Sequence, residues 1–173
     1  VGSQFNDLII NESEKYQEKN ETTADDIAVL QYTSGTTRKF PEAVKHYHKS
    51  VVVTVPLAVF VLGLRKEDRY FTPFHPSWGG GMWYGTIAPL ALGVTIGAYS
   101  DKFDPKIFLD ALREFKINNL SAPPTVYRMV KNSGLLDQYD LKLDKLSYSM
   151  EPMDTDTFEY FKKKFCVSLC SYY

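Results

Sequence analysis

Short apolar runs alternate with longer segments of helical period along most of the chain. The runs with strand character are IAVLQY (27–32), YFTPF (70–74), VTIGAY (94–99), NNLSA (118–122), LSYSM (146–150) and VSLCSYY (167–173). The segments between them carry apolar residues at the spacing of one helix face. Such alternation is typical of repeated βα units, whose crossover helices cover a parallel sheet. The sequence therefore predicts a three-layer α/β fold, with a mainly parallel sheet and helices on both faces.

Local signals place three of the helices. Asp104 supplies a side-chain oxygen for an N-cap and the following proline a fixed φ, so a helix is predicted over 104–115. A proline pair starts a second predicted helix, which runs to residue 131. Asp154 precedes a third amphipathic stretch, 155–165, in which the lysines crowd toward the C-terminal end of the helix dipole.

Size and charge narrow the classes of function. The 173 residues, 44% of them hydrophobic, suffice for one domain with a core. The 20 Lys and Arg are balanced by 21 Asp and Glu, so the net charge of -1 lacks the positive field that a nucleic-acid backbone requires. The longest apolar run, 51–64, falls short of the ~20 residues that cross a bilayer. We expect neither a nucleic-acid partner nor a membrane span.

Cysteine and histidine usage favours a cytoplasmic protein without a metal site of its own. The N-terminus lacks a signal-peptide pattern, and Cys166 and Cys170 form no metal-ligand spacing with the three histidines. His46 and His48 alternate along KHYHK without an acid or cysteine placed to complete a site, so both are expected at the surface. Any metal would arrive with a nucleotide.

The segment Tyr-Thr-Ser-Gly-Thr-Thr (32–37) carries the strongest chemical signal. It follows a predicted strand and sets four hydroxyl side chains around one glycine. Hydroxyls and free backbone N–H groups in a tight loop form the donor array that polyphosphate oxygens require. A Ser/Thr-rich turn has the same composition, so composition alone leaves both interpretations open.

This segment resembles the phosphate-binding motif TSGTTGxPK of the adenylate-forming superfamily. Further pieces resemble the family in the same order: PFHPSWGGG (73–81), KFDP (102–105), SAPPTVYRMV (121–130) and SMEPMDTDTFEYFKKKFCVSL (149–169), the last similar to the family's SGGEPL segment. The likeness covers nearly all of 25–173, after a peripheral leading segment, 1–24. Within the superfamily it is greatest to the acetate and medium-chain acyl-CoA ligases.

The resemblance implies part of an ATP-dependent acyl-CoA ligase. In this reaction a small-molecule carboxylate attacks the α-phosphate of Mg²⁺-bound ATP, which gives acyl-AMP and pyrophosphate, and coenzyme A then takes the acyl group. The implied phosphate-binding residues are Thr33, Ser34, Gly35, Thr36 and Thr37, with Lys39. The implied adenine-binding residues are Glu151 and Pro152. The implied acyl pocket contains His75, Trp78, Gly79 and Gly80, with Gly81 making room behind them; no catalytic residue is assigned.

Two of these residues have a structural alternative. A histidine between two prolines is also suited to a rigid turn, which would give His75 no contact with a substrate. A tryptophan is also suited to a hydrophobic core, which would make Trp78 an anchor of the fold. The sequence leaves both alternatives open.

Three positions depart from the family pattern. Arg38 replaces a glycine, and one additional residue precedes Pro41. Glu42 replaces a lysine, so an attractive charge toward polyphosphate becomes repulsive, which Lys39 partly offsets. Met150 replaces the glycine before the glutamate of the adenine segment. These departures favour an alternative function, a non-catalytic remnant or stand-alone module that binds a nucleotide or a partner.

The family also continues beyond the pattern seen at residues 171–173, into YGxTE and a small C-terminal domain with its adenylation lysine. We therefore expect one incomplete AMP-binding domain that does not complete a catalytic cycle alone. A general P-loop NTPase is disfavoured because G-x-x-x-x-G-K-[ST] does not occur. The acyl chain length and the oligomeric state, a homo-oligomer included, stay open.

Overall fold

The computed structural model describes residues 10, 21–33, 41–99 and 102–172. Within these ranges the main sheet has five strands in the order β4-β3-β5-β6-β7, and every neighbouring pair is parallel. The strands are β3 (Arg69–Phe71), β4 (Thr95–Ile96), β5 (Asn119–Ala122), β6 (Lys145–Tyr148) and β7 (Leu169–Ser171). The predicted parallel sheet is confirmed.

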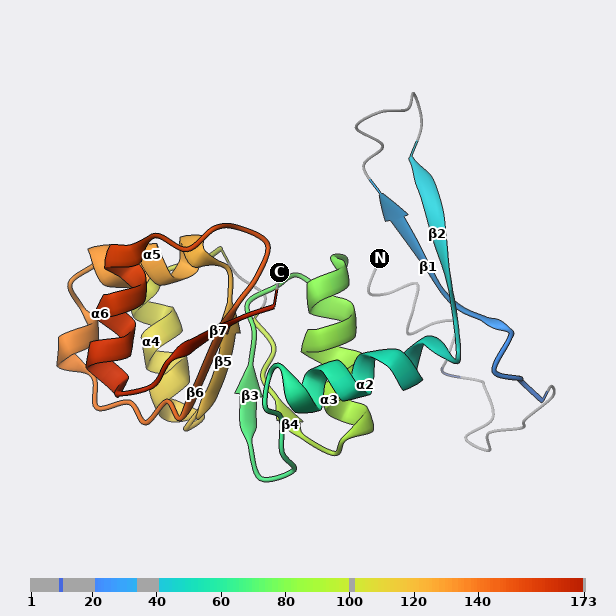
Figure 1. Cartoon of the computed structure of the whole chain (residues 1–173), viewed down its shortest axis with the longest axis horizontal. Coiled ribbons are helices and arrows are strands. Elements are labelled where there is room, and N and C mark those ends of the chain that lie inside the picture. The colour runs from blue at the N-terminus through green and yellow to red at the C-terminus, as the bar shows by residue number, and fades with distance from the viewer. Residues whose placement is uncertain (1–9, 11–20, 34–40, 100–101, 173) are drawn as a thin grey trace.

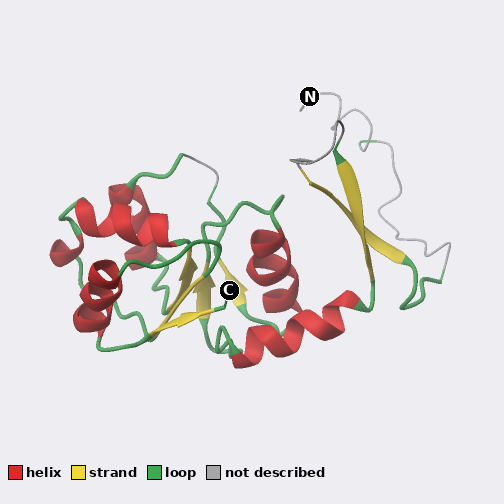
Figure 2. Ribbon diagram, turned by 45° about the horizontal axis from the view of Figure 1, so that its top comes forward, coloured by secondary structure: helices red, strands yellow, loops and turns green. Residues whose placement is uncertain are grey.

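Helices pack on both faces of this sheet and complete three layers (Figures 1 and 2). One layer contains α2 (Ser50–Phe60), the π-helical segment η1 (Gly80–Ile87) and α3 (Ala88–Ala91). The opposite layer contains α4 (Pro105–Glu114), α5 (Pro124–Asn132), the short 3-10 helix η2 (Leu136–Gln138) and α6 (Thr155–Phe165). None of the helices in the described ranges is long and apolar enough to span a membrane.

Each face of the sheet has its own hydrophobic core. Alternate residues of β5 point to opposite faces, and Leu120 faces the larger core, where it packs with Leu109 of α4, Tyr127 of α5 and Phe161 of α6. The smaller core, on the other face, consists of Ala58, Leu62, Leu64, Tyr70, Ala88 and Val94. All four residues of β5 are buried, the polar Asn119 and Ser121 included, because this strand is covered on both faces.

The predicted helix starts are confirmed at α4 and α6. The Asp104 carboxylate accepts a hydrogen bond from the backbone N–H of Ile107 at 2.9 Å. The Asp154 carboxylate accepts one from the N–H of Thr157 at 2.8 Å. Each bond satisfies one of the N–H groups that lack a partner in the first turn of a helix.

One predicted strand belongs to a different sheet. Residues 27–32 do form a strand, β1 (Ile27–Thr33), but β1 pairs antiparallel with β2 (Glu42–Tyr47) in a separate two-stranded sheet. Figure 1 shows this hairpin projecting away from the main body. Residues 27–32 therefore form a strand, as predicted, but this strand lies outside the five-stranded parallel sheet.

All five strands of the main sheet are shorter than predicted, and for two of them the structure gives a local reason. β6 ends at Tyr148 rather than residue 150, because Met150 takes a φ of 78°, which lies outside the extended region. β4 covers only 95–96 of the predicted 94–99, and at Gly97 the chain passes so near Phe71 that a Cβ would lie 2.7 Å from the Phe71 ring. Glycine therefore allows the close approach there.

Candidate functional site

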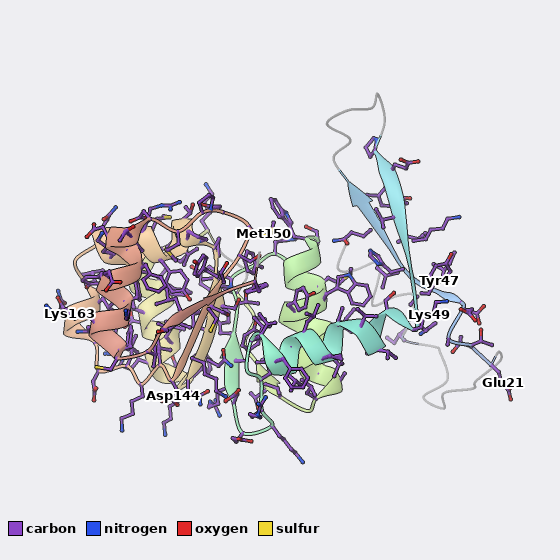
Figure 3. The ribbon with its side chains drawn as sticks, viewed as in Figure 1. Glu21, Tyr47, Lys49, Asp144, Met150 and Lys163 are labelled. Atoms are coloured by element: carbon purple, nitrogen blue, oxygen red, sulfur yellow. The ribbon has the colours of Figure 1, made fainter. Side chains whose placement is uncertain are left out.

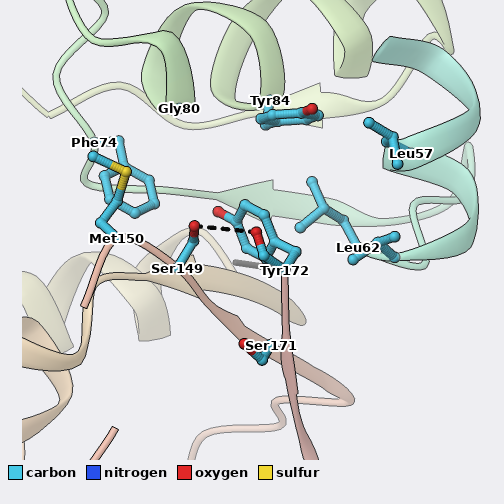
Figure 4. Close-up of a pocket in the computed structure, with 10 residues that line it drawn as sticks. Leu57, Leu62, Phe74, Gly80, Tyr84, Ser149, Met150, Ser171 and Tyr172 are labelled. Atoms are coloured by element: carbon cyan, nitrogen blue, oxygen red, sulfur yellow. Dashed lines mark hydrogen bonds between the residues drawn. The ribbon is translucent and has the colours of Figure 1, made fainter. Parts of the chain in front are cut away.

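A cavity of about 400 Å³ opens where the parallel strands β3, β6 and β7 end (Figure 4). Its lining comes from α2 and the turn after it, the loop after β3, η1, the loop after β6 and the end of β7. The lining residues are Leu57, Val61, Leu62, Phe74, Gly80, Tyr84, Ser149, Met150, Ser171 and Tyr172. Ligands of open parallel sheets bind outside the carboxyl ends of the strands, so this cavity is the candidate site.

Hydroxyl groups in the wall are held by hydrogen bonds within the protein. Ser149 Oγ donates to the Tyr172 carbonyl oxygen at 3.3 Å, which links the chain after β6 to the end of β7 (Figure 4). The Tyr172 hydroxyl lies 2.7 Å from Ser121 Oγ, and its ring meets Tyr84 edge-on at 5.9 Å between centroids. Burial raises the pKa of Tyr172 to about 12, so this phenol is neutral at pH 7.

The cavity therefore combines aliphatic and aromatic walls with a few uncharged hydroxyls. Among the residues that the structure describes, none that lines the cavity is an acid, a lysine or an arginine. Such a surface suits an apolar group of modest size, because an ionised group would lose its hydration without gaining a charged partner.

Glu151 and Pro152, the predicted adenine-binding residues, lie beside the cavity rather than in its wall. The Glu151 carboxylate accepts hydrogen bonds from Thr125 Oγ1 at 2.7 and 2.6 Å and from Arg128 Nη2 at 2.7 Å. Pro152 is exposed. Glu151 thus fastens the loop after β6 to α5, and its neighbour Met150 is the residue that reaches the cavity.

The four residues predicted for the acyl pocket differ in their relation to the cavity. Gly80 lines the cavity, whereas His75, Trp78 and Gly79 do not. His75 is exposed, and its Nδ1 accepts from the Ser77 N–H at 3.1 Å. Trp78 is 58% exposed, so the alternative of a core anchor is wrong in this structure.

Gly81 allows the backbone of His75 to approach η1 closely. A Cβ on Gly81 would lie 2.2 Å from the His75 carbonyl oxygen, so only glycine fits where η1 crosses the loop after β3. The glycine run is expected from the sequence to make room behind His75 and Trp78, and at this position the space is taken by the backbone of His75. The π-helical turn begins at this crossing.

Most of the predicted phosphate loop lies outside the described residues. Thr33 is the last residue of β1 and is paired in register with Glu42, the first residue of β2. Ser34, Gly35, Thr36, Thr37 and Lys39 fall in the range 34–40, as do the departures at Arg38 and Phe40. Their role in phosphate binding stays a prediction.

The two histidines of β2 and its turn differ in burial. His48 is exposed, as expected, but His46 is half-buried, and its ring meets Trp83 edge-on at 4.9 Å between centroids. The expectation of a surface position is therefore wrong for His46, which docks the hairpin on η1. No group of three or more His, Cys, Asp or Glu in the described ranges is arranged to hold a metal ion.

Several lining residues gave no signal in the sequence. Leu57 and Val61 lie in an apolar run that predicts only a buried helix, and Tyr84 lies in a segment with helical period. They meet Ser149 and Tyr172 only because the sheet brings together segments far apart in the chain. A sequence motif contains only residues that are close together in the chain, so it does not reveal a cavity wall that is built from distant segments.

Comparison with known proteins gives one family. The sequence model of the AMP-binding enzymes matches residues 3–173. The chain is 30% identical over 151 residues to an uncharacterized acyl-CoA ligase, YtcI, of Bacillus subtilis (strain 168), which covers 86% of this chain and 28% of that protein. It is also 30% identical over 140 residues to the acetyl-coenzyme A synthetase of the same organism, with 79% of this chain and 24% of the relative covered.

Solved structures have the same fold. The anthranilate CoA ligase AuaEII, in complex with anthranoyl-AMP, superposes with a TM-score of 0.86 at 25% identity and covers 99% of this chain and 34% of its own. An acyl-CoA synthetase of Brucella canis superposes with a TM-score of 0.84 at 21% identity, over 95% of this chain and 30% of its own. The chain therefore spans about a third or less of the proteins that it matches.

Proposed function

The chain belongs to the family of AMP-binding enzymes, and from this premise we propose that it forms part of an ATP-dependent acyl-CoA ligase. The proposed substrate is a short- or medium-chain carboxylate, with ATP, Mg²⁺ and coenzyme A as the other participants of the complete enzyme. In the first step a carboxylate oxygen bonds to the α-phosphorus and the bond to pyrophosphate breaks. In the second step the coenzyme A thiol displaces AMP.

The observation that carries this proposal is the cavity at the carboxyl ends of the strands. Its apolar wall, with Leu62, Phe74 and Met150, fits the hydrocarbon part of a carboxylic acid. The hydroxyls of Ser149, Ser171 and Tyr84 are uncharged, and hydroxyls can hydrogen-bond to the polar atoms near the reacting carbonyl of the substrate. A volume of about 400 Å³ suits a modest acyl group.

The chemical demand of the first step is charge neutralisation on the leaving pyrophosphate. In the proposal, the backbone and hydroxyl donors of residues 33–37 and Lys39 supply part of it. The described residues do not hold a ligand set for a metal ion, so we assign no Mg²⁺ ligands within them. Mg²⁺ supplies charge neutralisation when it is bound with the nucleotide.

We also propose a cytoplasmic location. Cys166 and Cys170 are free and exposed thiols. Such thiols persist in a reducing compartment and are lost to disulfides in an oxidising one.

A stable acyl-adenylate analogue tests the function directly. Octanoyl-sulfamoyl adenosine is titrated against the chain by calorimetry, with AMP as the analogue that lacks an acyl group. We expect the octanoyl compound to bind at least about tenfold more tightly, because the apolar chain leaves water. Gly80→Leu, which fills the cavity, is expected to abolish the difference. The matched variant Gly79→Leu, one residue outside the lining, is expected to retain it.

A second candidate function is nucleotide binding without acyl transfer. The observation that favours it is Met150, a residue with a side chain in a backbone conformation suited to glycine. Equal affinity for AMP and for the octanoyl analogue would support this candidate, because it would mean that the acyl group does not bind in the cavity.

A further inference from the structure

Met150 has a backbone conformation that residues with a side chain rarely adopt. Its φ is 78°, in the left-handed region where a Cβ meets the following carbonyl. Lys116 and Cys166 also have positive φ, but they end helices α4 and α6, where this conformation is common. Met150 lies in the loop between β6 and α6, where no helix end requires it.

Contacts on both sides hold this conformation in place. Before it, Ser149 Oγ is bonded to the Tyr172 carbonyl. After it, the Glu151 carboxylate is bonded to Thr125 and to Arg128. Position 150 therefore lies between two anchored residues, and backbone strain that its surroundings retain is concentrated at functional sites.

The side chain of Met150 lies where a ligand would meet it. It belongs to the lining of the cavity and is also 43% exposed, so it stands at the mouth. Figure 4 shows Met150 and Phe74 at one end of the cavity and Leu57 at the other, and Figure 3 places Met150 at the edge of the sheet between the two layers of helices. A thioether chain is flexible and adapts to irregular apolar surfaces.

We propose that Met150 is a specificity-determining residue that limits the length of the acyl group admitted to the cavity. This inference rests on the proposed function of the site. Glycine at position 150 would adopt the same φ without penalty but would leave the mouth open. Methionine narrows the mouth at the cost of backbone strain, and the anchors at Ser149 and Glu151 aim its side chain into the opening.

The test is the dependence of affinity on acyl length. Sulfamoyl adenosines with acetyl, butanoyl, octanoyl and dodecanoyl groups are titrated by calorimetry against the wild-type chain, Met150→Ala and Met150→Gly. Each methylene that enters an apolar site tightens binding about fourfold. We expect the wild-type affinity to stop rising at a shorter acyl group than in either variant, and the dodecanoyl-to-butanoyl ratio to increase at least about tenfold in both.

A matched control separates this role from a general effect of losing a methionine. Met129, on α5, is 40% exposed, almost the same as Met150, and does not line the cavity. Met129→Ala is expected to leave the length dependence unchanged. Thermal melting supplies a second readout: Met150→Gly should melt at a higher temperature than Met150→Ala, because only glycine relieves the positive φ.

The outcomes distinguish this inference from the proposed function. If all proteins bind the analogues with the same length dependence, Met150 has only a structural role and the inference is overturned while the function stands. If the wild-type chain binds none of the analogues, the proposed function fails and this inference fails with it. A shift in length dependence in Met150→Ala and Met150→Gly, absent in Met129→Ala, is the supporting result.

Discussion

Lys145 Nζ lies 2.8 Å from each carboxylate oxygen of Asp68, and this contact joins the start of β6 to the turn before β3. The Asp68 side chain is 1% exposed, and it also accepts hydrogen bonds from the Arg65 N–H at 2.9 Å and from Asn119 Nδ2 at 3.2 Å. The carboxylate is therefore surrounded by donors. This network fixes the amino ends of β3, β5 and β6, at the opposite edge of the sheet from the cavity.

Removing the cation should expose the cost of burying Asp68. In Lys145→Met the apolar stem is retained, but the buried carboxylate keeps only neutral donors. A broken buried pair costs about 3–5 kcal/mol, and since Lys145 is 34% exposed we expect about 2–3 kcal/mol in the free energy of unfolding by urea. Lys142→Met, at an exposed position in the preceding loop, is the control. A loss below about 0.5 kcal/mol would show that the neutral donors suffice.

Acid should weaken the start of α6. The backbone N–H of Thr157 bonds to the Asp154 carboxylate and lowers the pKa of Asp154 below its usual value. The stabilisation is therefore complete above the unfolded-state pKa of about 3.9 and is lost as the pH falls through the folded-state pKa. Asp154→Asn keeps a capping oxygen but does not titrate. We expect wild type to be the more stable protein at pH 7 and this advantage to vanish at low pH.

Urea midpoints measured for both proteins from pH 7 to pH 2 test the Asp154 prediction. Asp154 Oδ2 also lies 3.4 Å from Arg128 Nη1, so the comparison is repeated in the Arg128→Ala background. A pH-independent difference between the wild-type protein and Asp154→Asn would contradict an electrostatic contribution from the cap.

The sequence predicted those parts of the fold that depend on local chemistry. Aspartate caps located α4 and α6, and the short runs between segments of helical period located the central strands β5 and β6. The partner of β1 was missed. A parallel crossover needs about a dozen residues, and the connection 34–41 is shorter than that. The length of this connection therefore indicates an antiparallel hairpin, whereas the apolar pattern of residues 27–32 does not show which strand they pair with.

Only those residues of the candidate site that lie within a recognised sequence motif were predictable. Gly80 and Met150 were singled out from segments that resemble the family, and both line the cavity. Tyr172 and Leu57 were not, because their contribution comes from the packing of β7 and α2. The contact between Asp68 and Lys145 was not predictable either. Asp68 lies in a charged turn that resembles a solvated surface, and Lys145 is 77 residues away in the sequence.

Arg128 should control the mobility of the loop that carries Met150. Arg128 Nη2 lies 2.7 Å from Glu151 Oε2, and both side chains are 36% exposed, so the pair contributes at most about 1 kcal/mol. In Arg128→Ala we expect amide hydrogen exchange at residues 149–151 to accelerate about fivefold, with global stability changed by less than about 1 kcal/mol. Arg113→Ala, which breaks a pair with Asp110 on the outer side of α4, should leave this exchange unchanged.

The final prediction concerns the segment between β1 and β2. Glu42 begins β2 and is paired in register with Thr33, the first residue of the predicted phosphate-binding set. A carboxylate near polyphosphate is repelled by a few kcal/mol at an effective dielectric of ~20, and a lysine is attracted by a similar amount. Deleting Phe40 together with Arg38→Gly and Glu42→Lys restores the family pattern. After screening we expect Mg-ATP to bind about tenfold more tightly, or about 1.4 kcal/mol.

Calorimetry with Mg-ATP on the wild-type and restored chains measures this change. Glu67→Lys makes the same charge reversal in the exposed turn before β3, so it controls for net charge. A gain in the restored chain but not in Glu67→Lys would locate the nucleotide phosphates at this loop. Equal affinities in two well-folded proteins would mean that Lys39 and the backbone donors already neutralise the phosphates, and that the departures at Arg38 and Glu42 do not favour a non-catalytic module.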